Sequence, residues 1–130
     1  MSYYDANHYQ AVELETRTRS ASPYELVLVL YDGLLDELAR ARGHIEAKQY
    51  QQKGRSLEKC IKILNGLNAA LDYDNGGELI AGLGQLYEYC IRRIAEISIS
   101  LEVEGIDEVT HLLTTLREGW QGVQEQRHGI

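Results

Sequence analysis

The chain has 130 residues, a formal net charge of −7, two cysteines and one proline. This length is enough for a single domain with one hydrophobic core. The negative charge argues against a nucleic-acid or anionic-membrane partner, and no apolar run approaches the roughly 20 residues that cross a bilayer, so we expect neither nucleic-acid binding nor membrane insertion.

The first predicted helix begins after Ser22 and runs from Pro23 to about Ala47. The Ser22 hydroxyl can accept the backbone N–H of Glu25, the Glu25 carboxylate can accept that of Ser22, and the missing N–H of Pro23 is tolerated at the first helical position. The apolar residues that follow repeat at spacings of four and three, which is typical of a helix packed at a shallow angle against other helices. The same helix also has leucine and valine side chains on its other faces. We interpret this additional apolar surface as a binding surface.

Three more helices are predicted, from about Gln51 to Leu71, from Glu78 to Glu102 and from Ile106 to Gln124. The Asp-, Asn- and Gly-rich segment 72–77 predicts a tight turn between antiparallel neighbours. Glu104 and Gly105 are expected to end the pattern of the third helix.

Each of these helices has an apolar stripe that we expect to face the core. The stripe of the third helix includes Leu79, Leu83, Leu86 and Tyr87, and that of the fourth includes Leu116, Trp120 and Val123. Cys60 and Cys90 lie on the same kind of face, with no CxxC or Cys/His spacing, and are expected to be buried thiols.

The predicted fold is therefore all-α, an antiparallel up-and-down four-helix bundle over residues 22–125. Residues 1–21 are expected to form a short N-terminal arm or helix. The apolar residues of the arm, among them Tyr9, are too scattered for a fifth full bundle helix, but they can lie over apolar surface.

Small and apolar residues also lie to the side of the inward stripes of the second and third helices. A glycine inside a helix costs up to about 1 kcal/mol against alanine, which suggests that side chains have been removed to open a groove for a partner. The alternative is a wide apolar arc that packs against both neighbouring helices. The candidate contact residues are Ile63, Gly66 and Ala70 on the second helix and Ile80, Gly84, Ile91 and Ala95 on the third.

The sequence predicts no catalytic or metal site. A di-iron bundle needs two Glu-x-x-His pairs with inward side chains, whereas the pair of Glu108 and His111 points away from the apolar stripe. No nucleophile with its base and no phosphate-binding loop is present. We therefore expect no enzyme activity, metal or cofactor.

Several segments in chain order resemble the bacterial flagellin export chaperone family, FliS. The most specific are the Ala-Ser-Pro cap joined to Leu-Tyr-Asp-Gly and the tryptophan near the end. The matching segments are Ser20–Val27, Leu30–Gly33, Leu71–Asp72, Gly76–Gly77, Leu86–Tyr89 and Leu113–Trp120.

The resemblance implies a cytoplasmic bundle without catalytic activity that binds the disordered C-terminal segment of flagellin. In that family, binding prevents premature polymerisation until the flagellar export apparatus receives the flagellin. The resemblance also implies that the arm covers part of the groove in the empty protein, with Tyr9 as the matching contact, and Tyr87 is counted among the partner contacts.

Two other functions stay open at this point. Excess apolar surface can support a weak homodimer, so one alternative is a dimeric bundle that is not a chaperone. A metal- or cofactor-binding bundle is the other, and it would need Glu and His on inward faces that are almost purely apolar.

Overall fold

The computed structural model describes residues 22–128, with side chains as far as Val123. Within these residues the chain forms helices only, which confirms the all-α prediction. Their ends lie within a few residues of the predicted ones. The helices are α2 (Pro23–Glu46), α3 (Tyr50–Ala69), α4 (Gly77–Ser100) and α5 (Val103–His128).

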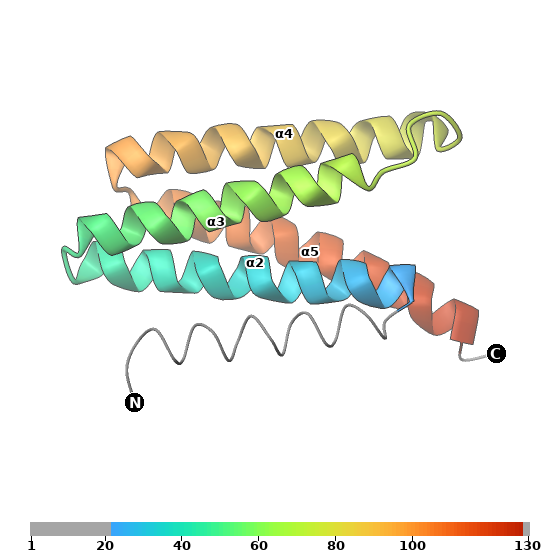
Figure 1. Cartoon of the computed structure of the whole chain (residues 1–130), viewed down its shortest axis with the longest axis horizontal. Coiled ribbons are helices and arrows are strands. Elements are labelled where there is room, and N and C mark those ends of the chain that lie inside the picture. The colour runs from blue at the N-terminus through green and yellow to red at the C-terminus, as the bar shows by residue number, and fades with distance from the viewer. Residues whose placement is uncertain (1–21, 129–130) are drawn as a thin grey trace.

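The four helices form a ring in chain order. Each helix packs against its neighbours in the chain, α5 closes the ring against α2, and within residues 22–128 the backbones of the diagonal pairs stay apart. Short loops make consecutive helices antiparallel, which confirms the up-and-down bundle (Figure 1). Helix α5 starts beside the end of α4 and then diverges from it, so these two helices are far apart where α4 begins (Figure 1).

The start of α2 has the predicted capping box. The Ser22 hydroxyl accepts the N–H of Glu25 at 3.2 Å, and the Ser22 N–H donates to the Glu25 carboxylate at 3.4 Å. Pro23 occupies the first helical position. Two of the N–H groups that a helix start leaves unpaired are thus accounted for, by one hydrogen bond and by one proline.

The turn between α4 and α5 differs from the prediction. The break falls at Leu101, whose left-handed backbone (φ 62°) ends α4, and not at Gly105. Gly105 instead lies buried in the first turn of α5. A Cβ atom there would lie 2.8 Å from Ile97 Cγ1 and 3.0 Å from Arg93 Nη2, so glycine lets the start of α5 approach α4 closely.

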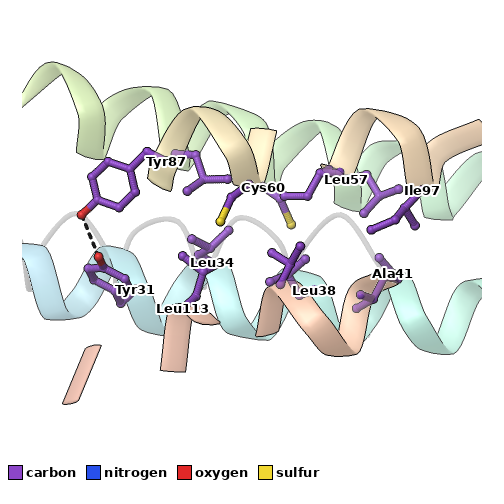
Figure 2. Close-up of a cluster of buried hydrophobic side chains, with 14 of the residues drawn as sticks. Tyr31, Leu34, Leu38, Ala41, Leu57, Cys60, Tyr87, Ile97 and Leu113 are labelled. Atoms are coloured by element: carbon purple, nitrogen blue, oxygen red, sulfur yellow. Dashed lines mark hydrogen bonds between the residues drawn. The ribbon is translucent and has the colours of Figure 1, made fainter. Parts of the chain in front are cut away.

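The core runs along the axis of the bundle and contains both cysteines as free thiols, which confirms their predicted burial (Figure 2). Burial raises the pKa of Cys60 to about 12 and that of Cys90 to about 11, because both thiolates would be poorly solvated. The fully buried core side chains include Tyr31, Leu34, Leu38, Leu57, Leu64, Leu67, Tyr87, Ile94, Ile97, Ile106, Val109 and Leu113.

Candidate partner-binding groove

Three apolar side chains that were expected in the core are exposed. Leu79 is 80% exposed, Leu86 36% and Val123 40%, so their predicted inward orientation is wrong. All three lie at the end of the bundle where α4 begins and α5 ends. Two packed helices would bury these stripes against each other, but here the helices have diverged (Figure 1).

The exposed side chains line an apolar groove of about 500 Å³ between the first half of α4 and the last part of α5. This volume lies within the range of ligand pockets. Glu78 is the only charged residue among those that line it. The lining residues are Glu78, Leu79, Ile80, Gly82, Leu83 and Leu86 of α4 and Leu116, Gly119, Trp120 and Val123 of α5.

Ion pairs show which helix holds α5 in place. Arg117 of α5 pairs with Asp32 of α2, with Nε 2.7 Å from Oδ1. Nearer the start of α5, Asp107 pairs with Arg42 of α2 at 2.8 Å. Helix α5 is therefore joined to α2 along most of the bundle, including at the level of the groove.

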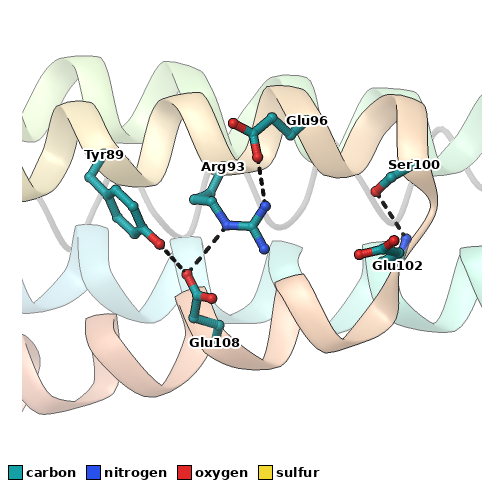
Figure 3. A network of polar contacts seen from close by, with 6 residues as sticks. All are labelled: Tyr89, Arg93, Glu96, Ser100, Glu102 and Glu108. Atoms are coloured by element: carbon teal, nitrogen blue, oxygen red, sulfur yellow. Dashed lines mark hydrogen bonds and ion pairs between the residues drawn. The ribbon is translucent and has the colours of Figure 1, made fainter.

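Polar contacts between α4 and α5 centre on Glu108, near the start of α5 (Figure 3). Its carboxylate accepts the hydroxyl of Tyr89 and lies 3.3 Å from Arg93 Nε. The hydrogen bond from Tyr89 is the largest factor that lowers the pKa of Glu108, followed by Arg93. The two helices are thus joined at one end of their contact and separate at the other, where the groove lies.

Two pairs of aromatic side chains connect α2 to the two helices that form the groove. The ring of Trp120 lies 6.1 Å from that of Tyr24 in the first turn of α2, at an interplanar angle of 57°. Deeper in the core, the hydroxyls of Tyr31 and Tyr87 share a hydrogen bond of 2.7 Å (Figure 2). Burial is the largest factor that raises the pKa of both tyrosines, so the pair is neutral at physiological pH.

The helical glycines serve different purposes. A Cβ atom at Gly82 or Gly119, one on each wall of the groove, would meet nothing within 4 Å. A Cβ atom at Gly84 would lie 2.1 Å from the hydroxyl oxygen of Tyr73, in the loop before α4. Gly84 thus makes room for a side chain of this chain, and its role in opening a groove for a partner stays a prediction.

The other predicted contact residues do not form one surface. Tyr87 is 1% exposed and belongs to the core, so it offers no surface to a partner. Ile63 and Ile91 are half-buried and pack against the core, as the wide-arc alternative predicted. Ile80 lines the groove.

Three predicted contact residues are exposed outside the groove, namely Gly66, Ala70 and Ala95. Their role in binding stays a prediction. Tyr9 lies outside the described residues, and so does the predicted arm of residues 1–21.

The groove residues lie on apolar stripes that were predicted to face the core, because helical periodicity identifies an apolar face but not what covers it. One signal could have separated them. Gly82 and Gly119 interrupt the stripes of Leu79, Leu86 and Trp120. Glycine lowers helix stability, and in a core stripe it would be expected only where a neighbouring helix approaches closely, which does not happen at these two positions.

Two other classes of site have no counterpart within residues 22–128. No group of three or more His, Cys, Asp or Glu side chains there could hold a metal ion. Within the same range, no helix is long and apolar enough to cross a membrane.

Comparison with known proteins identifies the family. The family model described as flagellar protein FliS matches residues 5–127. The chain belongs to the FliS family. The flagellar secretion chaperone FliSB of Pseudomonas aeruginosa is 42% identical over 115 residues, which cover 88% of this chain and 91% of the relative.

A second relative bears the same family name, and a solved structure has the same fold. The flagellar secretion chaperone FliS of Salmonella typhimurium is 39% identical over 116 residues, with 88% of this chain and 86% of the relative covered. A crystal structure of a bacterial flagellar chaperone has the same fold, with a TM-score of 0.76 at 22% identity, and covers 94% of this chain and 98% of that one. The chain is thus a four-helix member of a flagellar secretion chaperone family.

Proposed function

We propose that this FliS-family protein is a cytoplasmic chaperone that binds the disordered C-terminal segment of flagellin in the α4–α5 groove. Binding prevents flagellin from polymerising early and keeps it available to the flagellar export apparatus. The role is one of binding and release, without catalysis or a cofactor. The apolar groove between α4 and α5 is the observation that carries the proposal, because the family supplies the chaperone role and the groove supplies a place for a client.

The physical chemistry of the groove suits a segment that folds on binding. A disordered segment loses conformational entropy when it becomes ordered, so it needs apolar surface to compensate. Leu79, Leu86 and Val123 offer such surface outside the core. A helix that lays an apolar stripe into this groove would cover them and restore the packing that α4 and α5 do not give each other there.

Titration with a peptide of the flagellin C-terminal segment tests the proposal. The single tryptophan of the chain, Trp120, lines the groove. Its fluorescence should therefore shift to shorter wavelength as the peptide displaces water from the indole.

Two matched substitutions on α4 locate the binding site. Leu79 is 80% exposed in the groove, and Ile99 is 86% exposed near the other end of the same helix. Leu79→Asp should weaken peptide binding about tenfold or more, because a carboxylate would have to be desolvated, whereas Ile99→Asp should bind as the unmodified protein does. Because both side chains are exposed, neither variant should unfold. Equal binding by Leu79→Asp and the unmodified protein would show that the groove is not the site.

Self-association is the competing explanation for the exposed apolar surface. A dimer that buries the groove would be broken by Leu79→Asp and would ignore the peptide. Sizing chromatography of the protein with and without the peptide separates the two explanations.

A further inference from the structure

Charge is distributed unevenly around the groove. The stretch from Ile63 to Ile91 contains no Lys, Arg or His, and four acidic residues. This stretch comprises the end of α3, the loop that follows and the α4 wall of the groove. The acidic residues are Asp72, Asp74, Glu78 and Glu88.

The acidic groups collect at one end of the groove. Glu78 lines it, and Asp72 and Asp74 lie in the loop directly before α4. Asp72 accepts hydrogen bonds from Asn75, whereas Asp74 and Glu78 are exposed and form no ion pair with any described residue. Within residues 22–128, two carboxylates at this end of the groove therefore have no cation partner.

The cations nearest to the groove do not compensate for these carboxylates. Arg117 on α5 is held by Asp32 on α2. Along α4 the next cations are Arg92 and Arg93, beyond the other end of the groove, and Arg93 is engaged by Glu96 and Glu108. Among the described residues, the groove thus has unpaired acidic groups at the α3–α4 loop, and the next cations of α4 lie beyond its other end.

From this distribution we propose that the occupant of the groove is an amphipathic segment that carries Lys or Arg side chains at the end that lies over the α3–α4 loop. Its apolar face fills the groove, and its cations pair with the carboxylates of Asp74 and Glu78. Complementary charges of this kind fix the direction of a bound segment and speed its association more than they raise affinity. The assignment of this segment to flagellin rests on the proposed function, but the charge requirement itself does not.

Two synthetic helical peptides test the charge requirement without flagellin. They share one leucine face and carry either Lys or Glu at both ends, and Trp120 fluorescence reports their binding. At 50 mM NaCl the Lys peptide should bind the full chain about threefold to tenfold more tightly than the Glu peptide, and at 500 mM NaCl this preference should nearly vanish.

The double variant Asp74→Asn, Glu78→Gln should lose the preference for the Lys peptide at low salt. Glu88→Gln on the same helix is the matched control, because Glu88 is exposed, unpaired within the described residues and outside the groove lining, and it should keep the preference. Equal binding of the two peptides to the unmodified protein, binding of neither, or a preference that survives in the double variant would overturn the inference.

The flagellin peptide, titrated in parallel, tests the proposed function separately. If it fails to bind while the Lys peptide shows the expected preference, the charge requirement stands and the assignment to flagellin falls. If it binds equally well at both salt concentrations and to the double variant, flagellin is the client and the charge inference is wrong.

Discussion

Glycine occurs at two kinds of position in these helices. At Gly84 and Gly105 a Cβ atom would overlap Tyr73 or Ile97, so these side chains would have to move if a larger residue stood there. At Gly82 and Gly119 a Cβ atom would meet nothing within 4 Å. Glycine lowers the stability of the helix at these positions, and no packing contact requires it there. Gly82 and Gly119 both line the groove, and close approach of a client is the reason that we infer for these two.

Gly82→Ala and Gly119→Ala should each stabilise the free protein by up to about 1 kcal/mol, since alanine has the higher helix propensity. Both should also weaken binding of the flagellin peptide, because a methyl group would occupy the space that the client backbone approaches. Urea denaturation measures the first effect and Trp120 fluorescence titration the second.

Gly66→Ala on α3 is the matched control. Gly66 is exposed and open in the same way but lies outside the groove. The protein should gain stability and keep its affinity. Weaker binding by Gly66→Ala together with unchanged binding by Gly82→Ala would move the site to the lateral surface of α3.

At the scale of elements, α5 is held differently along its length. Glu108 joins its start to α4, and Arg117 joins its later part to Asp32 of α2. Trp120 then contacts Tyr24 in the first turn of α2. The α5 wall of the groove thus depends on a well-formed start of α2, which the capping box at Ser22 provides.

Ser22→Ala should lower the free energy of unfolding by about 0.5 to 2 kcal/mol, because one N–H of the first turn loses its acceptor. Urea denaturation should show a lower midpoint, while peptide affinity should hardly change, since no groove residue is altered. Ser22→Asp keeps an acceptor oxygen and should retain most of the stability. An unchanged midpoint for Ser22→Ala would show that the cap contributes nothing to the folded state.

For the whole molecule, the net charge of −7 and the apolar α4–α5 groove of the described residues have opposite effects on self-association. Net charge opposes self-association, and a segment that covers the groove would oppose it further. Residues 1–21 contain four of the tyrosine and leucine residues suited to such a cover, namely Tyr3, Tyr4, Tyr9 and Leu14.

Removal of residues 1–17 should tighten binding of the flagellin peptide or speed its association. A competing cover reduces apparent affinity by the fraction of time that the groove is closed. Titration of the full and shortened chains measures the change, and a dye that reports exposed apolar surface should give a stronger signal with the shortened chain. Weaker binding after truncation, with no rise in dye signal, would contradict a competing arm.

The helices, their order and the buried thiols could be predicted from the amino-acid sequence alone. These features depend on local chemistry, namely the Ser22 cap, the turn residues near Gly76 and the 3.6-residue period of the apolar stripes. Each of these signals involves residues close together in the sequence, so the sequence is enough to predict the features. Cys60 and Cys90 follow from the same period.

Only the tertiary structure decided where the groove lies. Leu79 and Ile97 belong to the same apolar stripe of α4, yet one is 80% exposed and the other fully buried. The difference arises because α5 is close to α4 beside Gly105 and far from it beside Gly119. That separation depends on contacts between residues distant in sequence, such as Arg117 with Asp32. A local sequence pattern does not predict which other helix will pack against a given helical face.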